Sequence, residues 1–394
     1  MQKKVLLLIA LCCAANVHAQ IKFQKFYDPQ KTQAAVEGMM SDDSVRIGTW
    51  TWWHPNGKVY QQGSYNSRGE KEGIWNIFYD DGSKCAVECY TDGFTREWYR
   101  DGTLKSEVPV KGGLKNGIYK SWFPDGQQRD EIPFVNGVKQ GPSREWHENG
   151  QLKFQGTYVD NELNGMAKWW TETGKLDMQG MLKDGDQQGE WLFYWRTNGR
   201  IGIRGNYDQG VETGTWTYYY ETGEKWREGT YVNGEKQGKW TTWYESGNKL
   251  HEGDYVDNEE NGVWTAWYED GRIDYVGTFR NGKKNGEWKG FYDDGRLRYV
   301  MHYRDDEKDG EEIRYFPNGK IEYRANYRNG VWHGKYERYN SAGKPEEMGT
   351  FVNGEKDGKW LFYDEHGKVA VEAVFREGKL VSQEYKTDNT PRRR

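Results

Sequence analysis

The sequence predicts an all-β fold, an elongated single-layer antiparallel sheet built from repeated β-hairpins. Three observations predict it: a glycine that recurs every 20–25 residues, aromatic rings at fixed distances after that glycine, and turn-forming Asn-Gly or Asp-Gly pairs between the ring-bearing segments. A fixed period of this length is typical of repeat architectures, in which each unit buries its apolar face against its neighbours.

The glycine that opens each unit defines fourteen repeats. These opening glycines are Gly48, Gly73, Gly93, Gly117, Gly141, Gly165, Gly189, Gly214, Gly238, Gly262, Gly286, Gly310, Gly334 and Gly358. The fifth residue after each of them is aromatic, and the second is tryptophan in eight repeats: Trp50, Trp75, Trp191, Trp216, Trp240, Trp264, Trp288 and Trp360. Positions are numbered below from the opening glycine.

Each repeat is interpreted as two strands and two turns. The aromatic segment, such as residues 216–220, has strong β character, and a second strand follows the Asp-Gly or Asn-Gly turn, as in residues 296–303. The connection to the next repeat commonly holds Asn-Gly, because hairpin turns place residues at positive φ. Rings at positions two and five would lie on opposite faces of a regular strand. Either a bulge shifts the register or both faces carry aromatic residues.

The rings divide into a predicted core set and a predicted binding set. Because the chain has few aliphatic residues, we expect the fifth-position ring to belong to the core. The sixth-position ring is the better candidate for a binding surface. In six consecutive repeats it forms an uninterrupted run, a predicted aromatic ladder: Trp195, Tyr220, Tyr244, Tyr268, Tyr292 and Phe316.

The segments outside the repeats are expected to differ in kind. Residues 1–19 are predicted to be a secretory signal peptide, since two lysines precede an apolar run and Ala19 suits cleavage. The protein is therefore expected to be periplasmic or extracellular, with no transmembrane segment in the mature chain. Residues 20–45 either cap the first sheet edge or remain flexible, residues 46–380 hold the fourteen repeats, and residues 381–394 are expected to be a polar, disordered tail.

Composition argues against several functional classes. The mean hydropathy is −1.09 and 30% of residues are charged, yet 16% are aromatic, which is enough large rings to hold a fold together. The formal net charge of −5 offers no basic field for nucleic acid. The mature chain keeps only Cys85 and Cys89, which on one extended strand lie too far apart for a disulfide unless the chain turns between them. They are interpreted as small buried thiols.

No catalytic residue, cofactor or metal site is predicted. The sequence lacks the nucleophile, metalloprotease and phosphate-loop motifs, and His54 and His147 occupy the sixth position, where other repeats hold tyrosine. Acidic turns such as Asp305, Asp306 and Asp309 are the best calcium candidate. Aspartate is also an ordinary turn former, and that interpretation is favoured.

Residues 233–264, NGEKQGKWTTWYESGNKLHEGDYVDNEENGVW, resemble MORN-type repeats in the bacterial variant found in proteins of the YwqK antitoxin family. The resemblance covers about residues 46–380. It implies a twisted β-hairpin sheet used for interaction; related repeats are linked with protein scaffolding and sometimes with membranes.

Two functions follow from these predictions. The first is an exported, non-catalytic repeat scaffold that binds another protein, in a form that includes antitoxin-like or immunity-like binding. The alternative is binding of a cell-envelope glycan or lipid headgroup through the aromatic ladder, because exposed rings stack on sugars and cage quaternary ammonium groups.

Overall fold

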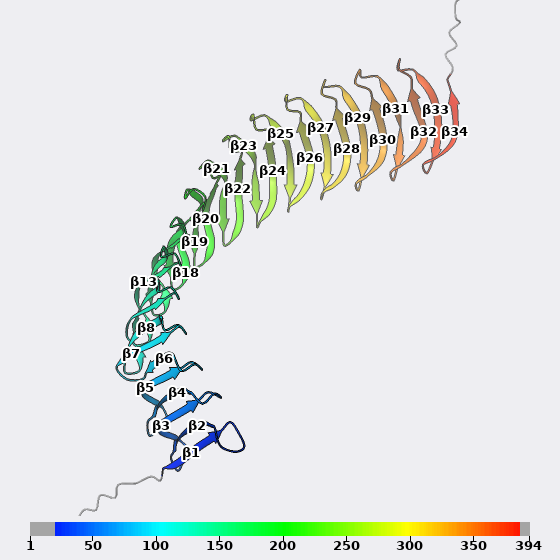
Figure 1. Cartoon of the computed structure of the whole chain (residues 1–394). Coiled ribbons are helices and arrows are strands. Elements are labelled where there is room, and N and C mark those ends of the chain that lie inside the picture. Colours follow the sequence, from blue (N-terminus) through cyan, green and yellow to red (C-terminus); the bar gives the residue numbers. More distant parts are fainter. Residues whose placement is uncertain (1–19, 387–394) are drawn as a thin grey trace, which may run out of the picture. The chain divides into compact units, whose positions relative to one another are not determined.

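The computed structural model describes residues 20–386, and these residues form 34 strands and no helix (Figure 1). The chain divides into two compact units. The described part of the N-terminal unit holds residues 20–175 and 182–185, and that of the C-terminal unit holds residues 176–181 and 186–386. The predicted signal peptide lies outside the described residues.

The strands of the N-terminal unit are β1 (Ile21–Phe26), β2 (Ala34–Met40), β3 (Arg46–Trp53), β4 (Val59–Tyr65), β5 (Lys71–Phe78), β6 (Lys84–Cys89), β7 (Gly93–Trp98), β8 (Leu104–Lys111), β9 (Leu114–Lys115), β10 (Gly117–Trp122), β11 (Gln128–Val135), β12 (Val138–Lys139), β13 (Gly141–Trp146), β14 (Leu152–Val159), β15 (Glu162–Leu163) and β16 (Gly165–Trp170). β17 (Leu176–Lys183) contributes residues to both units.

The strands of the C-terminal unit are β18 (Asp186–Tyr194), β19 (Ile201–Asp208), β20 (Val211–Tyr219), β21 (Lys225–Val232), β22 (Glu235–Trp243), β23 (Lys249–Val256), β24 (Glu259–Trp267), β25 (Ile273–Arg280), β26 (Lys283–Phe291), β27 (Leu297–Arg304), β28 (Glu307–Tyr315), β29 (Ile321–Arg328), β30 (Val331–Tyr339), β31 (Pro345–Val352), β32 (Glu355–Tyr363), β33 (Val369–Arg376) and β34 (Lys379–Tyr385).

Within each unit the strands pair with their sequence neighbours, and every pairing is antiparallel. From β18 to β34 each strand pairs with the next one, so that successive hairpins lie side by side (Figure 1). The N-terminal unit has the same arrangement, with β10 pairing with both β8 and β11. The prediction of an all-β antiparallel hairpin repeat is therefore confirmed.

First strands such as β22 carry two irregularities, which resolve the ambiguous aromatic alternation. In β22 the register to β23 shifts between Thr242 and Trp243, next to the fifth-position ring. On the side of β21, residues 238–240 face Gly229 alone. The opening Gly238 lies in this bend with φ of 63°, a left-handed conformation that glycine adopts without strain. Of the two predicted alternatives, the bulge is the one that the structure contains.

The largest core side chains are the second-position tryptophans, joined by second-strand residues such as Val108 and Phe154, which corrects the prediction that the fifth-position ring fills the core. The eight second-position tryptophans are between 0 and 5% exposed. The fifth-position rings, such as Trp243 and Trp267, are only half-buried. The misassignment arose because the sequence does not show where the strand bends, and the bend at the opening glycine decides which of the two rings packs on the preceding strand.

Each buried tryptophan packs on a glycine of the preceding strand. A Cβ atom added to Gly229 would overlap the indole of Trp240, and the same holds for Gly253 beneath Trp264. Most of these indoles also donate a hydrogen bond from Nε1 to a carbonyl of that strand, as Trp264 does to Asp254 at 3.2 Å. The glycine therefore provides the close approach that seats the ring.

Residues 20–45 form a further, divergent repeat. β1 pairs with β2, and β2 pairs with β3, so the segment covers the edge of the first predicted repeat. The register of β1 shifts before Phe26, just as that of β3 shifts before Trp53. Phe23 contacts Trp50 with ring centroids 5.4 Å apart, as a second-position ring would. Of the two predicted alternatives, the cap is the one that the structure contains.

The structure at β34 and β6 bears on two further predictions, those for the C-terminal tail and for the two cysteines. β34 extends to Tyr385, so residues 381–385 form an exposed strand rather than the disordered start of the tail, while residues 387–394 lie outside the described residues. The apolar residues Leu380 and Val381 explain this strand, because they continue the β pattern past the expected boundary. Cys85 and Cys89 are free thiols on the single strand β6, and Cys89 is buried.

Candidate functional site

The sixth-position rings of the predicted aromatic ladder connect neighbouring repeats. The hydroxyl of Tyr220 donates a hydrogen bond of 2.8 Å to the backbone carbonyl of Trp243, the fifth-position residue of the next repeat. Three further tyrosines of the ladder, Tyr244, Tyr268 and Tyr292, make the same bond to the following repeat at 2.6–2.9 Å. These four rings are half-buried. Their polar ends therefore hold adjacent turns together.

The two ends of the ladder differ from its middle. Trp195 makes the equivalent bond from its indole Nε1 to the carbonyl of Tyr219 at 3.2 Å, and it is the one member classed as exposed. Phe316 has no polar group with which to make it. Among the described residues, no ring pair joins one of the six to the next. The structure thus brings these residues to one edge of the C-terminal unit, each in its own turn, without stacking them on one another.

Histidine replaces tyrosine in this bond where the sequence predicted a substituted ring. In the N-terminal unit, His54 Nε2 lies 3.0 Å from the carbonyl of Phe78, and His147 Nε2 lies 2.8 Å from that of Trp170. Tyr27 of the divergent repeat makes the same bond to Trp53. The interpretation of both histidines as ring replacements is confirmed.

Further side chains at the same edge reinforce the contact between turns. Eighth-position asparagines donate to a carbonyl of the next turn, as Asn149 Nδ2 does to Glu172 at 2.6 Å. Tenth-position lysines also donate to the following turn, as Lys320 Nζ does to the carbonyl of Ala342 at 2.5 Å. Most turns therefore donate at least one bond forward to the next turn, which fixes the spacing of the repeats.

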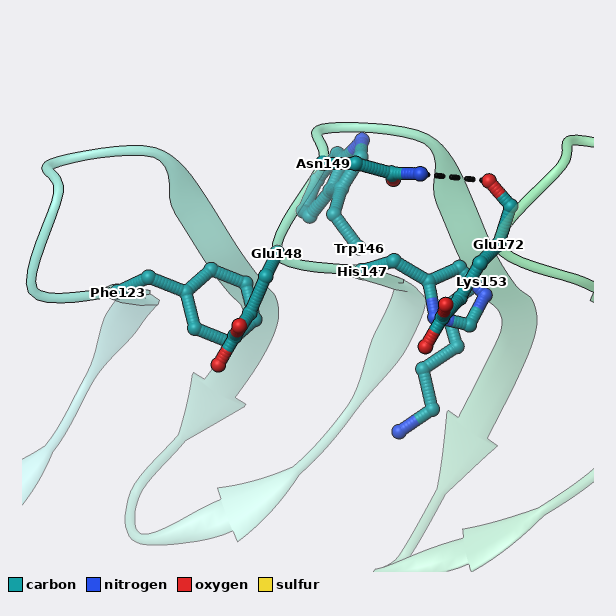
Figure 2. A pocket seen from close by; sticks show the side chains of 7 residues that line it. All are labelled: Phe123, Trp146, His147, Glu148, Asn149, Lys153 and Glu172. Carbon is teal, nitrogen blue, oxygen red and sulfur yellow. Dashed lines mark hydrogen bonds between the residues drawn. The ribbon is translucent and has the colours of Figure 1, made fainter.

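One hollow opens at this edge in the N-terminal unit. It has a volume of about 460 Å³ and is lined by Phe123, Trp146, His147, Glu148, Asn149, Lys153 and Glu172. Figure 2 shows these side chains on three successive turns, with the bond from Asn149 to the carbonyl of Glu172 crossing between two of them. The hollow therefore combines aromatic surface with two carboxylates and the ammonium group of Lys153.

The acidic turns use their carboxylates within the fold. Asp306 Oδ1 accepts the backbone N–H of Lys284 at 2.8 Å, and Asp305 accepts a bond from Arg280 at 3.2 Å. Asp309 pairs with Arg304 at 2.6 Å. Asp305 and Asp306 also have positive φ angles, as turn residues do. Within residues 20–386 no group of three or more histidine, cysteine or acidic side chains is placed to hold a metal ion.

A surface that the sequence-based prediction missed lies on the face opposite the buried tryptophans, here called the outer face. It is formed by positions one and three of each first strand and by the residues paired with them on the second strand. In the N-terminal unit it carries large exposed apolar side chains, among them Ile74 and Ile118. The signal was available in the sequence, because position one is apolar in five successive repeats.

Eight segments of the chain match the family model described as MORN repeat variant. They are residues 46–67, 139–160, 212–233, 236–257, 284–305, 308–329, 332–353 and 356–377. These eight segments are similar to the MORN repeat variant. Each matched segment begins two residues before an opening glycine, so the match has the same register as the predicted units.

Other comparisons add little to the match with the MORN variant. No curated protein matches this chain. Solved structures that align with it include the crystal structure of TcdB2-TccC3, at 11% identity over 91% of this chain and 23% of that chain, with a TM-score of 0.17. The crystal structure of TcdB2-TccC3-Cdc42 aligns at 10% identity over 91% of this chain and 24% of that chain, with a TM-score of 0.16. The chain spans about a quarter of those chains, and likeness at such TM-scores carries no argument. Residues 20–386 contain no helical segment with the length and apolar character that a membrane crossing demands.

Proposed function

We propose that this protein is an exported, non-catalytic scaffold that binds another protein across several consecutive repeats. One observation carries the proposal: the core lies on one face of the sheet, where eight repeats bury a tryptophan, and position-one side chains of the outer face are exposed over many repeats. Large exposed apolar side chains on such a face are typical of interaction surfaces. The match with the MORN variant supports a repeat scaffold.

Export rests on the predicted signal peptide and is tested separately. Mass spectrometry of the protein from its native host should give a mature N-terminus at Gln20, after cleavage following Ala19. Recovery of an intact Met1 terminus in the cytoplasmic fraction would contradict it. Neutralising a toxin in the periplasm or at the cell surface, as the resemblance to the YwqK antitoxin family implies, is one form of the proposed binding.

The binding proposal is tested with the mature chain, residues 20–394, as bait against native envelope extract, with an insoluble cell-wall pellet assayed in parallel. We expect one stoichiometric polypeptide in the eluate and no bait in the pellet. Sedimentation of the bait with the pellet, reversed by soluble sugar or choline, would contradict the proposal and favour glycan or headgroup binding.

Binding of a glycan or lipid headgroup is the second candidate, and the hollow beside Trp146 favours it. Aromatic surface next to the carboxylates of Glu148 and Glu172 suits a cationic headgroup such as choline. If this function holds, Trp146→Ala should abolish choline binding in calorimetry, whereas Trp170→Ala, a fifth-position change outside the hollow's lining, should not. Equal affinity of the two variants would exclude the hollow.

A further inference from the structure

The outer face of the N-terminal unit carries a continuous apolar stripe. At position one of successive repeats it presents Ile74, Phe94, Ile118, Pro142 and Met166; four of these, all but the exposed Pro142, are 42–59% exposed. The strands between them add Pro109, paired with Phe94, and Pro133, paired with Ile118. The stripe therefore has an apolar side chain on each of β7, β8, β10, β11 and β13, while on β14 the residue paired with Pro142 is Thr157.

The C-terminal unit forms the same series of antiparallel hairpins without these apolar residues, although its first strands are continuous where those of the N-terminal unit are split, as into β9 and β10. Its position-one residues are also exposed, and all but Val263 are polar or charged: Glu190, Thr215, Lys239, Glu287, Glu311, Lys335 and Lys359. The chain thus contains its own comparison. A stripe kept apolar in solvent in one unit, and absent from the other, indicates a contact with another molecule.

A row of cations runs beside the stripe on the same face. Position three holds Arg96, Lys120, Arg144 and Lys168 in four consecutive repeats. The guanidinium of Arg96 lies 4.7 Å from the ring centroid of Phe94, which places the two rows side by side. Only two carboxylates interleave with the cations: Glu107 at 2.5 Å from Arg96 and Glu131 at 3.7 Å from Arg144. Among the described residues Lys120 and Lys168 make no ion pair.

The distance between successive side chains of the stripe indicates which secondary structure of a partner fits it. From Phe94 on β7 to Met166 on β16 the stripe crosses β8, β10, β11, β13 and β14. At about 4.8 Å between strands it is roughly 29 Å long. An amphipathic helix presents an apolar residue every turn of about 5.4 Å, and about 19 residues cover that length. Side chains on one face of a β-strand are ~6.7 Å apart, which matches the spacing of the stripe less well than a helical turn does.

We propose that the apolar stripe and its cation row bind an acidic amphipathic helix of a partner protein, with the helix lying across the strands of the N-terminal unit. The row holds four cations and two carboxylates, with Lys120 between Glu107 and Glu131 on the neighbouring strands, so carboxylates beside the apolar face of the helix would complement its net positive charge. An anionic bilayer fits less well, because Glu107 and Glu131 would repel it and the stripe is one residue wide on each strand. This inference rests on the proposed function as a protein-binding scaffold.

The first test uses a fluorescein-labelled synthetic helix of nineteen residues, with leucine along one face and glutamate beside it, and a copy that carries lysine in place of glutamate. Binding to the mature chain is followed by fluorescence anisotropy. We expect the glutamate helix to bind, and the double variant Ile118→Ser, Met166→Ser to weaken it about tenfold or more. Lys120→Glu with Lys168→Glu should do the same.

Matched controls lie at the same positions of the C-terminal unit. Val263→Ser repeats the stripe change and Lys289→Glu repeats the charge change, and neither should alter binding. All of these side chains are exposed or half-buried, so melting temperatures should stay near that of the wild type. Absence of binding by the glutamate helix, equal binding of the lysine helix, or unchanged binding in the stripe variant would overturn the proposal.

Two other occupants and the proposed function itself are distinguished in parallel. Cosedimentation with phosphatidylglycerol vesicles that the stripe variant loses would assign the surface to a membrane, and a dimer in light scattering that the same variant dissolves would assign it to a second copy. Either result overturns the inference. If wild type and stripe variant capture the same polypeptide equally from the native extract, the scaffold function is supported but the stripe is not its binding surface. If the variant no longer captures that polypeptide, the result supports both the scaffold function and the stripe as its binding surface.

Discussion

At the residue scale, the sizes of two facing core residues on adjacent strands are complementary: where one is small, the other is large. Where the preceding strand supplies glycine, as at Gly229, the next repeat supplies tryptophan, as at Trp240. Where it supplies Met301, the next repeat holds the smaller Glu312. Because interiors are close-packed, the two sites must change together.

This exchange predicts the effect of Gly229→Ala. The added methyl group would overlap the indole of Trp240, so we expect a loss of about 1–3 kcal/mol in the free energy of unfolding. The double variant Gly229→Ala, Trp240→Tyr should recover part of that loss, because the chain already holds Ala325 beside Tyr336. Urea unfolding followed by tryptophan fluorescence measures both. A neutral single variant would show that the indole moves aside freely.

Buried Glu312 predicts a pH dependence. Its side chain is 1% exposed and accepts bonds from Lys308 Nζ at 2.7 Å and from the Tyr323 hydroxyl at 2.8 Å. Burial alone would raise the pKa of Glu312, but these bonds outweigh it and hold the pKa below its ordinary value of 4.5. Ionised Glu312 therefore contributes stability that is complete above about pH 4.5 and is lost as the pH falls through the lowered pKa.

The variant Glu312→Gln should lose about 1–3 kcal/mol near neutral pH, because Lys308 loses its charged partner. It should also lose the part of the acid sensitivity that Glu312 causes. Urea midpoints of wild type and variant, measured from pH 3 to pH 7, should therefore converge at the acid end. Parallel curves over that range would remove Glu312 as the cause.

At the element scale, the hairpins could be predicted from the sequence but their internal bends could not. Glycine and ring spacing located the repeats, because both are periodic and local. The core ring was assigned to position five instead of two, because only the bulge at Gly238 shows which ring turns inward. The divergent first repeat was missed for a similar reason: Ile21 stands where the opening glycine would be.

The bend predicts that an opening glycine can be replaced by a larger residue without a steric clash, but that the positive φ strains any residue other than glycine. No atom lies within 4 Å of a Cβ placed on Gly238, yet its φ is 63°. Gly238→Ala should therefore cost about 1–2 kcal/mol through backbone strain alone. Gly238→Asn should cost less, because asparagine enters this region more readily and does so at Asn233. Melting temperatures should fall from the wild type to the asparagine variant and then to the alanine variant. An alanine variant as stable as the asparagine variant would contradict the strain argument.

At the scale of the whole molecule, the candidate binding surfaces differ in how far the sequence could predict them. The sixth-position ladder was located correctly, but its hydrogen bonds to the next turn depend on how repeats stack, as Tyr220 shows. The apolar stripe could not be predicted without knowing which face of the sheet each residue lies on. The sequence alone does not show that Ile118 belongs to the outer face. Both surfaces exist because contacts pass only between neighbouring repeats, which leaves each repeat free to vary its outer residues.

Contacts limited to neighbours predict that damage stays local. Trp360→Ala removes a fully buried ring that packs on Gly349 and contacts Phe351, at a cost of about 3–5 kcal/mol. In a repeat array this loss should open the strands around β32 without a common collapse. Hydrogen exchange followed by mass spectrometry should show faster exchange in peptides from β30 to β34 and unchanged exchange in the N-terminal unit. The matched variant Trp75→Ala should give the reverse pattern, with faster exchange around β5 and none in the C-terminal unit. Uniform acceleration along the chain in either variant would mean that the two units unfold as one cooperative body, and that a binding event on the outer face of one would stabilise the other.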